Sequence, residues 1–142
     1  MNRKKVVVGI IVDNNEVFLL RHNKCKGLFV FPSGKIEEGE TSEEALIREL
    51  KEELNINVLE YKEFIRNVPQ WYDRVDGVMH TAEDLFIIEK YDGELINNEP
   101  TKHLELIKIN LDEIINNPKE FAYSTYLYAL VINSENIKGE IN

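Results

Sequence analysis

Three glutamates at positions 49, 52 and 53 fall within a stretch that is predicted to be helical. At about 100° per residue, Glu49, Glu52 and Glu53 share one arc of the helix that spans roughly 100°. Like charges at these spacings repel one another, so a nearby cation is needed to balance them. Mg²⁺ takes carboxylate oxygens as ligands, commonly together with the phosphates of a substrate. The spacing allows a divalent-metal site, but for an acidic helix taken alone the alternative, a charged face that contacts only solvent, is the more common case.

Other residues stand at fixed intervals around these glutamates. Gly34 is followed after five residues by Glu40, and Glu40 is followed after seven residues by Arg48. The whole segment matches the pattern G-x5-E-x7-R-E-U-x-E-E-x-G-U, in which U is a bulky aliphatic residue, at every specified position except Asn55. This segment resembles the signature sequence of the Nudix hydrolases. The order of strands and helices around it also resembles that family, so the resemblance covers most of the chain.

The resemblance implies a role for each matched residue. Glu49, Glu52 and Glu53 correspond to the metal ligands of the family, and the expected metal is Mg²⁺, for which Mn²⁺ can substitute. Arg48 corresponds to the arginine that orients a catalytic glutamate, and Glu40 to a signature glutamate near the metal site. Together with Gly34 these residues form the Nudix box, and the catalytic residues are expected among Arg48 and the three clustered glutamates.

Ser33 and Glu99 are further candidate metal ligands. Ser33 stands where relatives often have a glycine whose carbonyl binds metal, and Glu99 lies in the loop sequence NNEPTK. Glu52 and Glu53 are the first choices for the general base. Glu99 is another candidate for that role, and its alternative interpretation is an ordinary solvated residue. Asn55 replaces the last glycine of the signature without an expected loss, because Asn tolerates the left-handed conformation that ends a helix.

The sequence around the box suggests a substrate. FPSGKIEEGET resembles the mutator-type branch, which hydrolyses nucleoside triphosphates to monophosphate and pyrophosphate. The alternatives are hydrolysis of another nucleoside diphosphate derivative, such as ADP-ribose, a nucleotide sugar or a dinucleotide, and a catalytically silent nucleotide-binding module. Basic residues are candidates for phosphate contact and aromatic residues for stacking on the base, each with an ordinary surface or core position as the alternative. They are Arg21, Lys35 and Arg74, and Phe31, Trp71, Tyr72 and Tyr123.

The elements that position these residues are read from hydrophobic periodicity and from turn and cap residues. Thr41 and Glu44 predict a capping box at the start of the central helix. Asp13, Asn14 and Asn15 predict a hairpin turn. Strands are expected at 6–12, 16–21, 28–31, 56–65, 78–91 and 104–109, helices at 42–54, 111–115 and 119–133, and loops at 32–40 and 66–77.

This order predicts one α/β domain over residues 1–142, a length sufficient for a core without disulfides or metals. The expected fold is a Nudix-type α/β/α sandwich with a mixed β-sheet. One face of the sheet is expected to carry the central catalytic helix, and the other face the C-terminal helix.

The net charge of the chain and the length of its apolar segments exclude some classes of binding partner. The formal net charge of −9 repels a bare nucleic-acid backbone, so the expected partner is a small-molecule nucleotide rather than a nucleic acid. The single cysteine, Cys25, excludes an intrachain disulfide and fits a reducing compartment. The apolar run at 6–12 lacks the features of a signal peptide, and no segment approaches the roughly 20 apolar residues needed to cross a bilayer. We therefore expect a cytoplasmic monomer or homodimer without a membrane partner.

Overall fold

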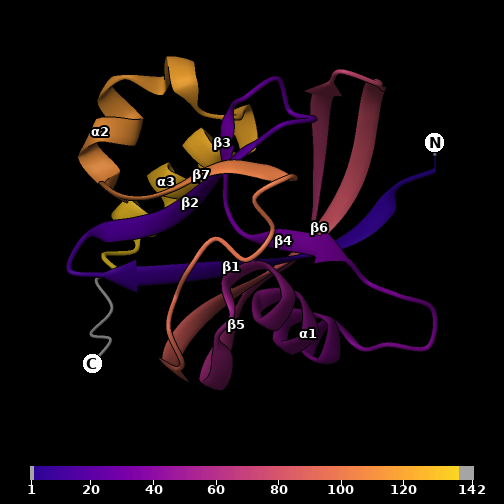
Figure 1. Ribbon diagram of the computed structural model, residues 1–142. Coiled ribbons are helices and arrows are strands. Elements are labelled where there is room, and N and C mark those ends of the chain that lie inside the picture. The colour runs from indigo at the N-terminus through magenta and orange to yellow at the C-terminus, as the bar shows by residue number, and fades with distance from the viewer. Residues whose placement is uncertain (1, 138–142) are drawn as a thin grey trace.

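A mixed β-sheet lies between two groups of helices in the computed structural model, which describes residues 2–137 (Figure 1). The strands are β1 Lys4–Asp13, β2 Glu16–His22, β3 Phe29–Val30, β4 Ser33–Lys35, β5 Asn57–Arg74, β6 Gly77–Asp92 and β7 His103–Asn110. The helices are α1 Ser42–Leu54, α2 Leu111–Asn116 and α3 Tyr123–Ser134, with a 3-10 turn at Pro118–Glu120. The strand order is β3-β2-β1-β6-β5, with β4 paired to β1 and β7 paired to β2. β1 and β6 run parallel, which makes the sheet mixed.

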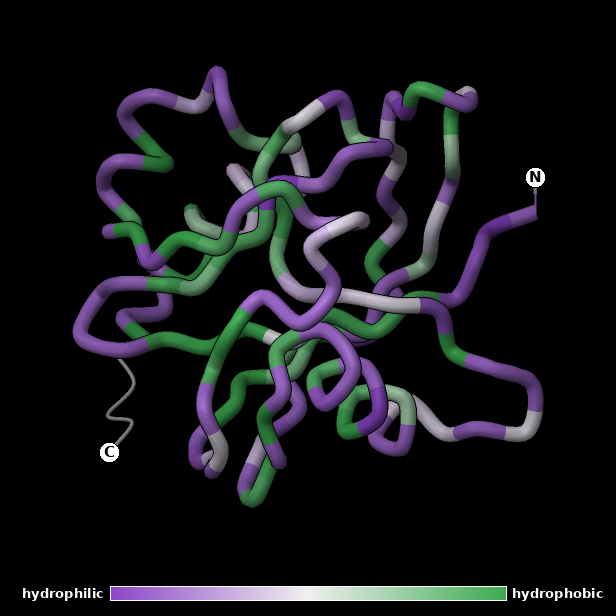
Figure 2. The backbone as a smooth tube through the Cα atoms, in the orientation of Figure 1, coloured by the Kyte–Doolittle hydropathy of each residue, from purple (hydrophilic) through white to green (hydrophobic). Residues whose placement is uncertain are grey.

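Side chains alternate along β1 and divide the core into two parts. Val6, Val8 and Ile10 pack on the face that α2 and α3 cover, while Val7 and Ile11 pack against α1. The helices therefore lie on opposite faces of the sheet (Figure 1), and Figure 2 shows the hydrophobic residues concentrated in the central strands. The predicted sandwich, with its central and C-terminal helices, is confirmed.

Both ends of α1 follow from local sequence. The Thr41 hydroxyl accepts a hydrogen bond from the amide of Glu44, and the Glu44 carboxylate accepts one from the amide of Thr41. Asn55 ends the helix with a φ of 62°, the left-handed conformation expected of it. Gly9 lets α1 approach the sheet closely, because a Cβ there would lie 2.9 Å from Cδ1 of Leu50. These features fix the helix that carries the three clustered glutamates.

The prediction of a loop at residues 66–77 is wrong. β5 continues through this stretch to Arg74 and pairs with β6 along its length. Because β5 is an edge strand, it tolerates the missing N–H of Pro69. Register shifts in the pairing surround Asn67, whose φ is 62°. The proline and the polar residues mark an irregular edge strand, not a loop.

Tertiary pairing also moves two other predicted boundaries. Part of the loop expected at 32–40 pairs with β1 as β4. The last helix begins at Tyr123, later than the predicted residue 119, because the chain before it pairs with Phe29. The amide of Ala122 and the hydroxyl of Thr125 both donate to the Phe29 carbonyl at 3.0 Å. Neither this helix nor another within residues 2–137 is long and apolar enough to span a membrane.

Candidate active site

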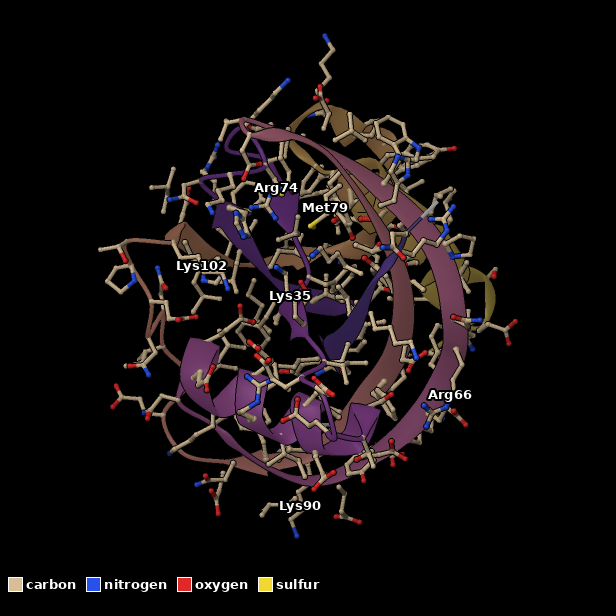
Figure 3. All side chains as sticks on the ribbon, turned by 90° about the vertical axis from the view of Figure 1, so that its right-hand side faces the viewer. Lys35, Arg66, Arg74, Met79, Lys90 and Lys102 are labelled. Carbon is tan, nitrogen blue, oxygen red and sulfur yellow. The ribbon has the colours of Figure 1, made fainter. Side chains whose placement is uncertain are left out.

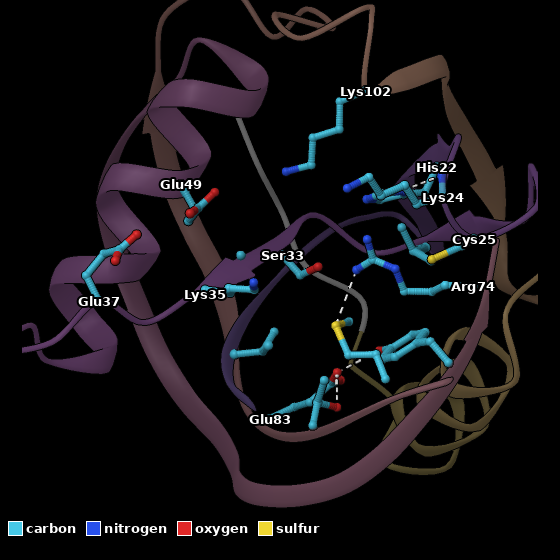
Figure 4. A pocket seen from close by; sticks show the side chains of 16 residues that line it. His22, Lys24, Cys25, Ser33, Lys35, Glu37, Glu49, Arg74, Glu83 and Lys102 are labelled. Atoms are coloured by element: carbon cyan, nitrogen blue, oxygen red, sulfur yellow. Dashed lines mark hydrogen bonds between the residues drawn. The ribbon is translucent and has the colours of Figure 1, made fainter. Parts of the chain in front are cut away.

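A cavity of about 330 Å³ lies between α1, β4 and the hairpin formed by β5 and β6 (Figure 4). Figure 3 shows Lys35, Arg74 and Lys102 around this region, whereas Arg66 and Lys90 lie away from it. Residues of both charge signs line the cavity: Lys24, Lys35, Arg74 and Lys102, and Glu37, Glu49 and Glu83. A space with carboxylates on one wall and several cations nearby is suited to a ligand that carries phosphates and is bound together with a metal ion.

Glu49 projects from α1 toward the cavity, directly against β4 (Figure 4). It is 8% exposed, and burial raises the pKa of its carboxyl group while Arg48 opposes that rise. Gly34 makes this position possible, because a Cβ at Gly34 would overlap the carboxylate of Glu49. A glycine is therefore required at position 34, because the Glu49 side chain approaches the backbone there closely.

Arg48 connects the loop before α1 to the glutamates on it. Its Nε and Nη2 donate to the two carboxylate oxygens of Glu40 at 2.8 and 2.9 Å. Its Nη1 donates to Oε1 of Glu49 at 2.8 Å and reaches Glu52 at 3.4 Å. The hydrogen bonds from Arg48 lower the pKa of Glu40 to about 2. Arg48 thus holds Oε1 of Glu49 by a hydrogen bond, and its role in orienting a catalytic glutamate stays a prediction.

Glu53 is the most buried of the clustered glutamates, with 1% of its surface exposed. Oε1 accepts a hydrogen bond from the amide of Ser33 at 3.1 Å. Oε2 lies 3.3 Å from Nζ of Lys102 and 3.5 Å from Nε2 of His103. Burial raises the pKa of Glu53 to about 8, and the nearby lysine only partly offsets that effect. A further cation beside Glu53 would offset the cost of its buried charge.

Glu53, Glu99 and His103 together offer a donor set for a metal ion. One ligand atom from each lies within 4.8 Å of the others. Two hydrogen bonds from Asn98 hold the Glu99 loop against the end of α1. Its backbone amide donates to the Glu53 carbonyl at 2.9 Å, and its side-chain Nδ2 donates to the Glu52 carbonyl at 3.1 Å. The sequence suggested Glu99 as a ligand but gave no reason to include His103. Nδ1 of His103 has no hydrogen-bond partner within residues 2–137.

A second buried carboxylate, Glu83, lies at the other end of the cavity (Figure 4). It is 1% exposed and accepts hydrogen bonds from the hydroxyls of Tyr72 at 2.7 Å, Thr81 at 2.8 Å and Tyr128 at 2.7 Å. Burial raises the pKa of Glu83, and the three hydroxyls oppose the rise. Sequence reasoning missed this residue, although a signal exists. Glu83 shares the strand face of Leu85 and Ile87, so it is a charged residue in a core-facing register.

The predicted substrate residues separate into two groups. Lys35, Arg74 and Tyr72 line the cavity. Arg21, Phe31 and Trp71 do not, so their prediction as substrate-binding residues is not supported by their positions. Arg21 pairs with Glu105 at 3.2 Å and covers the ring of Phe29, Phe31 is 3% exposed and packs on Tyr128, and Trp71 is 52% exposed on the outer surface. Tyr123 is 59% exposed and stacks on Tyr126.

Comparison with known proteins accounts for this arrangement. The model of the NUDIX domain family matches residues 3–130. The chain belongs to the NUDIX family. It is 33% identical over 123 residues to the 8-oxo-dGTP diphosphatase of Escherichia coli, a match that covers 80% of this chain and 88% of that relative. It is also 36% identical to the ADP-ribose pyrophosphatase of Methanocaldococcus jannaschii, over 73% of this chain but only 61% of that relative. The chain is therefore a NUDIX hydrolase, and the names of its relatives refer to different nucleotides.

The fold agrees with solved structures of the family. A MutT NUDIX hydrolase from Burkholderia pseudomallei superposes with a TM-score of 0.78, at 22% sequence identity, over 92% of this chain and 98% of the other. At that level of identity the match establishes the NUDIX fold alone.

Proposed function

We propose that this NUDIX enzyme hydrolyses nucleoside triphosphates to monophosphate and pyrophosphate in the cytoplasm, with Mg²⁺ as its metal. The observation that carries the proposal is the cavity that Glu49 of α1 lines together with a group of basic side chains. A triphosphate needs metal ligands and cations at one end of its site and space for a base at the other. The similarity to the 8-oxo-dGTP diphosphatase, over most of both chains, supports the same substrate class.

The residues around α1 fit a hard divalent ion. Glu49, Glu53 and Glu52 supply carboxylate oxygens, while Glu99 and the Ser33 carbonyl are the further candidates. Burial raises the pKa values of Glu49 and Glu53, which means that their ionised forms are costly here, and a bound divalent cation would offset that cost. A bound divalent ion supplies charge neutralisation for the phosphates and a Lewis acid that helps to activate water.

The sequence made Glu52 and Glu53 the first choices for the general base, but we assign proton acceptance to Glu49, because it lines the cavity and they do not. It faces the cavity, and Arg48 fixes its Oε1, which leaves Oε2 to take a proton from the attacking water. The water oxygen forms a bond to the α or β phosphorus, the bridging P–O bond between these atoms breaks, and pyrophosphate and nucleoside monophosphate separate. Lys35 and Lys102 lie beside the carboxylates and neutralise the negative charge on the phosphates.

The second candidate is a diphosphate derivative such as ADP-ribose, because one relative with that activity is 36% identical. Purified protein with Mg²⁺ should be tested against nucleoside triphosphates, ADP-ribose, nucleotide sugars and dinucleotides. The proposal requires pyrophosphate as the first product from a triphosphate, and ¹⁸O water locates the attacked phosphorus by mass spectrometry. Orthophosphate as the first product, or much faster turnover of ADP-ribose than of every triphosphate, contradicts the proposal.

A further inference from the structure

The cavity ends at a carboxylate that the proposed hydrolysis does not use. Glu83 lies away from Glu49, with the cavity between them (Figure 4). An ionised carboxylate has about four acceptor positions. Among the described residues, Oε2 of Glu83 accepts two hydroxyl hydrogen bonds and Oε1 accepts one. Oε1 therefore keeps an acceptor position, and three hydroxyls hold the carboxylate in one orientation.

Arg74 supplies donors in the wall of the same cavity. Its side chain is 14% exposed, and its Nη1 donates to the sulfur of Met79 at 3.3 Å, which is a weak acceptor. Its Nε pairs by charge with Asp76 but has no aligned hydrogen-bond acceptor within residues 2–137. Figure 4 shows Arg74 above Glu83 on the same side of the cavity. A guanidinium with free donor positions and a carboxylate with a free acceptor position in one cavity are suited to a polar ring edge that carries both a donor and an acceptor.

We propose that Glu83, together with Arg74, selects the nucleobase, and that it favours a lactam edge in which an N–H adjoins a carbonyl oxygen. In this arrangement Oε1 of Glu83 accepts the ring N–H, and Arg74 donates to the carbonyl oxygen. Guanine, hypoxanthine and uracil present this edge. The corresponding edge of adenine or cytosine places a ring nitrogen lone pair against the carboxylate and an amino group against the guanidinium.

Binding of adenine or cytosine in this position costs free energy, because the unmatched polar groups are buried in the protein. A buried acceptor that faces another acceptor, or a donor that faces a donor, loses its hydrogen bond without recovering one from water. Sites built around such groups reject the wrong partner more strongly than apolar pockets do. Val6, Val30 and Met79 line the same cavity and provide apolar contact for the faces of a planar ring. The three hydroxyls around Glu83 act through it and are positioning residues.

The inference rests on the proposed triphosphate hydrolysis, so the experiment has a binding arm and a kinetic arm. The binding arm uses calorimetry in EDTA with GMP, IMP and UMP against AMP and CMP, and it needs no catalysis. The kinetic arm compares kcat/KM for the corresponding triphosphates with Mg²⁺. We expect the wild-type protein to favour the lactam group by about tenfold or more in both arms. Glu83→Gln, which keeps the volume but adds a donor, should reduce that ratio at least about tenfold.

The controls separate base selection from damage to the fold and from failure of the proposed function. Glu37→Gln alters another cavity carboxylate, away from Glu83, and should leave the ratio unchanged. Arg74→Met acts on the same ring edge from an edge strand and should reduce the ratio in the same direction, even if Glu83→Gln fails to fold. Equal binding of both groups of monophosphates by the wild-type protein overturns the inference. Base-selective binding without triphosphate hydrolysis overturns only the proposed function.

Discussion

Glu53 and Glu83 are both 1% exposed, and burial raises the pKa of each, yet their surroundings differ in kind. Glu53 meets a lysine, a histidine and a single backbone amide. Glu83 meets three hydroxyls, each at hydrogen-bond distance of a carboxylate oxygen. Glu53 therefore lies beside a charged lysine and a titratable histidine, whereas Glu83 is held in one orientation by neutral hydroxyl donors.

This difference teaches that two equally buried carboxylates in one protein can be suited to different tasks. Neutral hydroxyls orient a carboxylate without cancelling its charge, which is compatible with the proposed role of Glu83 as a fixed acceptor for a ligand. Glu53 has neighbouring carboxylates on the same helix and loop, and its nearest cation, Lys102, is 40% exposed on a flexible stem. Its charge is balanced only in part, which suits exchange of that lysine for a metal ion.

The largest expected effect comes from removing the Glu53 charge. Glu53→Gln keeps volume and helix propensity but removes one proposed ligand, so kcat should fall about a hundredfold or more with every nucleotide. Binding of Mn²⁺, followed by electron paramagnetic resonance, should weaken in parallel. Glu83→Gln should retain Mn²⁺ binding and change activity in a base-dependent way. Equal loss of Mn²⁺ binding in the two variants would remove the distinction between these carboxylates.

A second large effect is expected at Gly34. In Gly34→Ala the new Cβ overlaps the carboxylate of Glu49, so that side chain must leave its place beside Arg48. We expect a fall in kcat of about ten- to a hundredfold, as for residues that orient ligands. Overpacking should also cost about 1–3 kcal/mol of unfolding free energy.

Ser33→Ala is the matched control for Gly34→Ala. It adds no atom and keeps the Ser33 amide that donates to Glu53. Its kcat and urea midpoint should stay near the wild-type values. If Gly34→Ala also keeps its kcat, the close contact between β4 and Glu49 is not required for catalysis.

Much of the carboxylate end of the cavity was predictable because local sequence determines it. The spacing of Glu49, Glu52 and Glu53, the capping box and Asn55 are features of one helix, and helix geometry translates spacing into position. Their different burial was not predictable, because it depends on packing: Glu49 and Glu53 are covered by β4 and the Glu99 loop, whereas Glu52 is exposed.

The Glu83 end of the cavity depends on pairing between distant parts of the chain, and sequence reasoning did not predict most of it. Tyr72 was expected in a loop, but the continuous β5 brings it beside Glu83 on β6. Tyr128 comes from α3, on a distant part of the chain. Trp71 and Phe31 were chosen for their aromatic type alone, and the strand register places them on the outer surface and in the core. The sandwich itself was predictable because the hydrophobic pattern identifies its main strands and helices.

A smaller effect is expected when Lys102 is neutralised. Its Nζ lies 3.3 Å from Glu53 and 4.0 Å from Glu99, so it competes with a metal ion for the same carboxylates. Because the lysine is partly exposed, its charge is screened, and Lys102→Met should tighten Mn²⁺ binding by only about tenfold or less. Calorimetric titration of the two proteins measures the change. Weaker Mn²⁺ binding in the variant would show that Lys102 supports the metal site.

The smallest expected effects concern the pH dependence of stability, for which the pKa values of Glu40 and Glu83 are shifted in opposite directions. Arg48 lowers the pKa of Glu40 from 4.5 to about 2. A carboxyl group with a lowered folded-state pKa stabilises the protein above its unfolded pKa, and that contribution is lost as pH falls from 4.5 to about 2. Burial raises the pKa of Glu83, so its contribution to stability declines as pH rises above 4.5 through the folded pKa.

Urea unfolding in EDTA from pH 2 to 8, with Glu40→Gln and Glu83→Gln as the comparison proteins, tests these signs. The stability difference between the wild-type protein and Glu40→Gln should rise between about pH 2 and 4.5 and then stay constant. The difference between the wild-type protein and Glu83→Gln should fall as pH increases above 4.5, because the wild-type chain must hold a buried charge. Subtracting each variant cancels the titration of the other groups. Parallel pH curves for the two differences would mean that the hydroxyls around Glu83 stabilise its ionised form as effectively as Arg48 stabilises Glu40, and that desolvation does not set the pKa of Glu83.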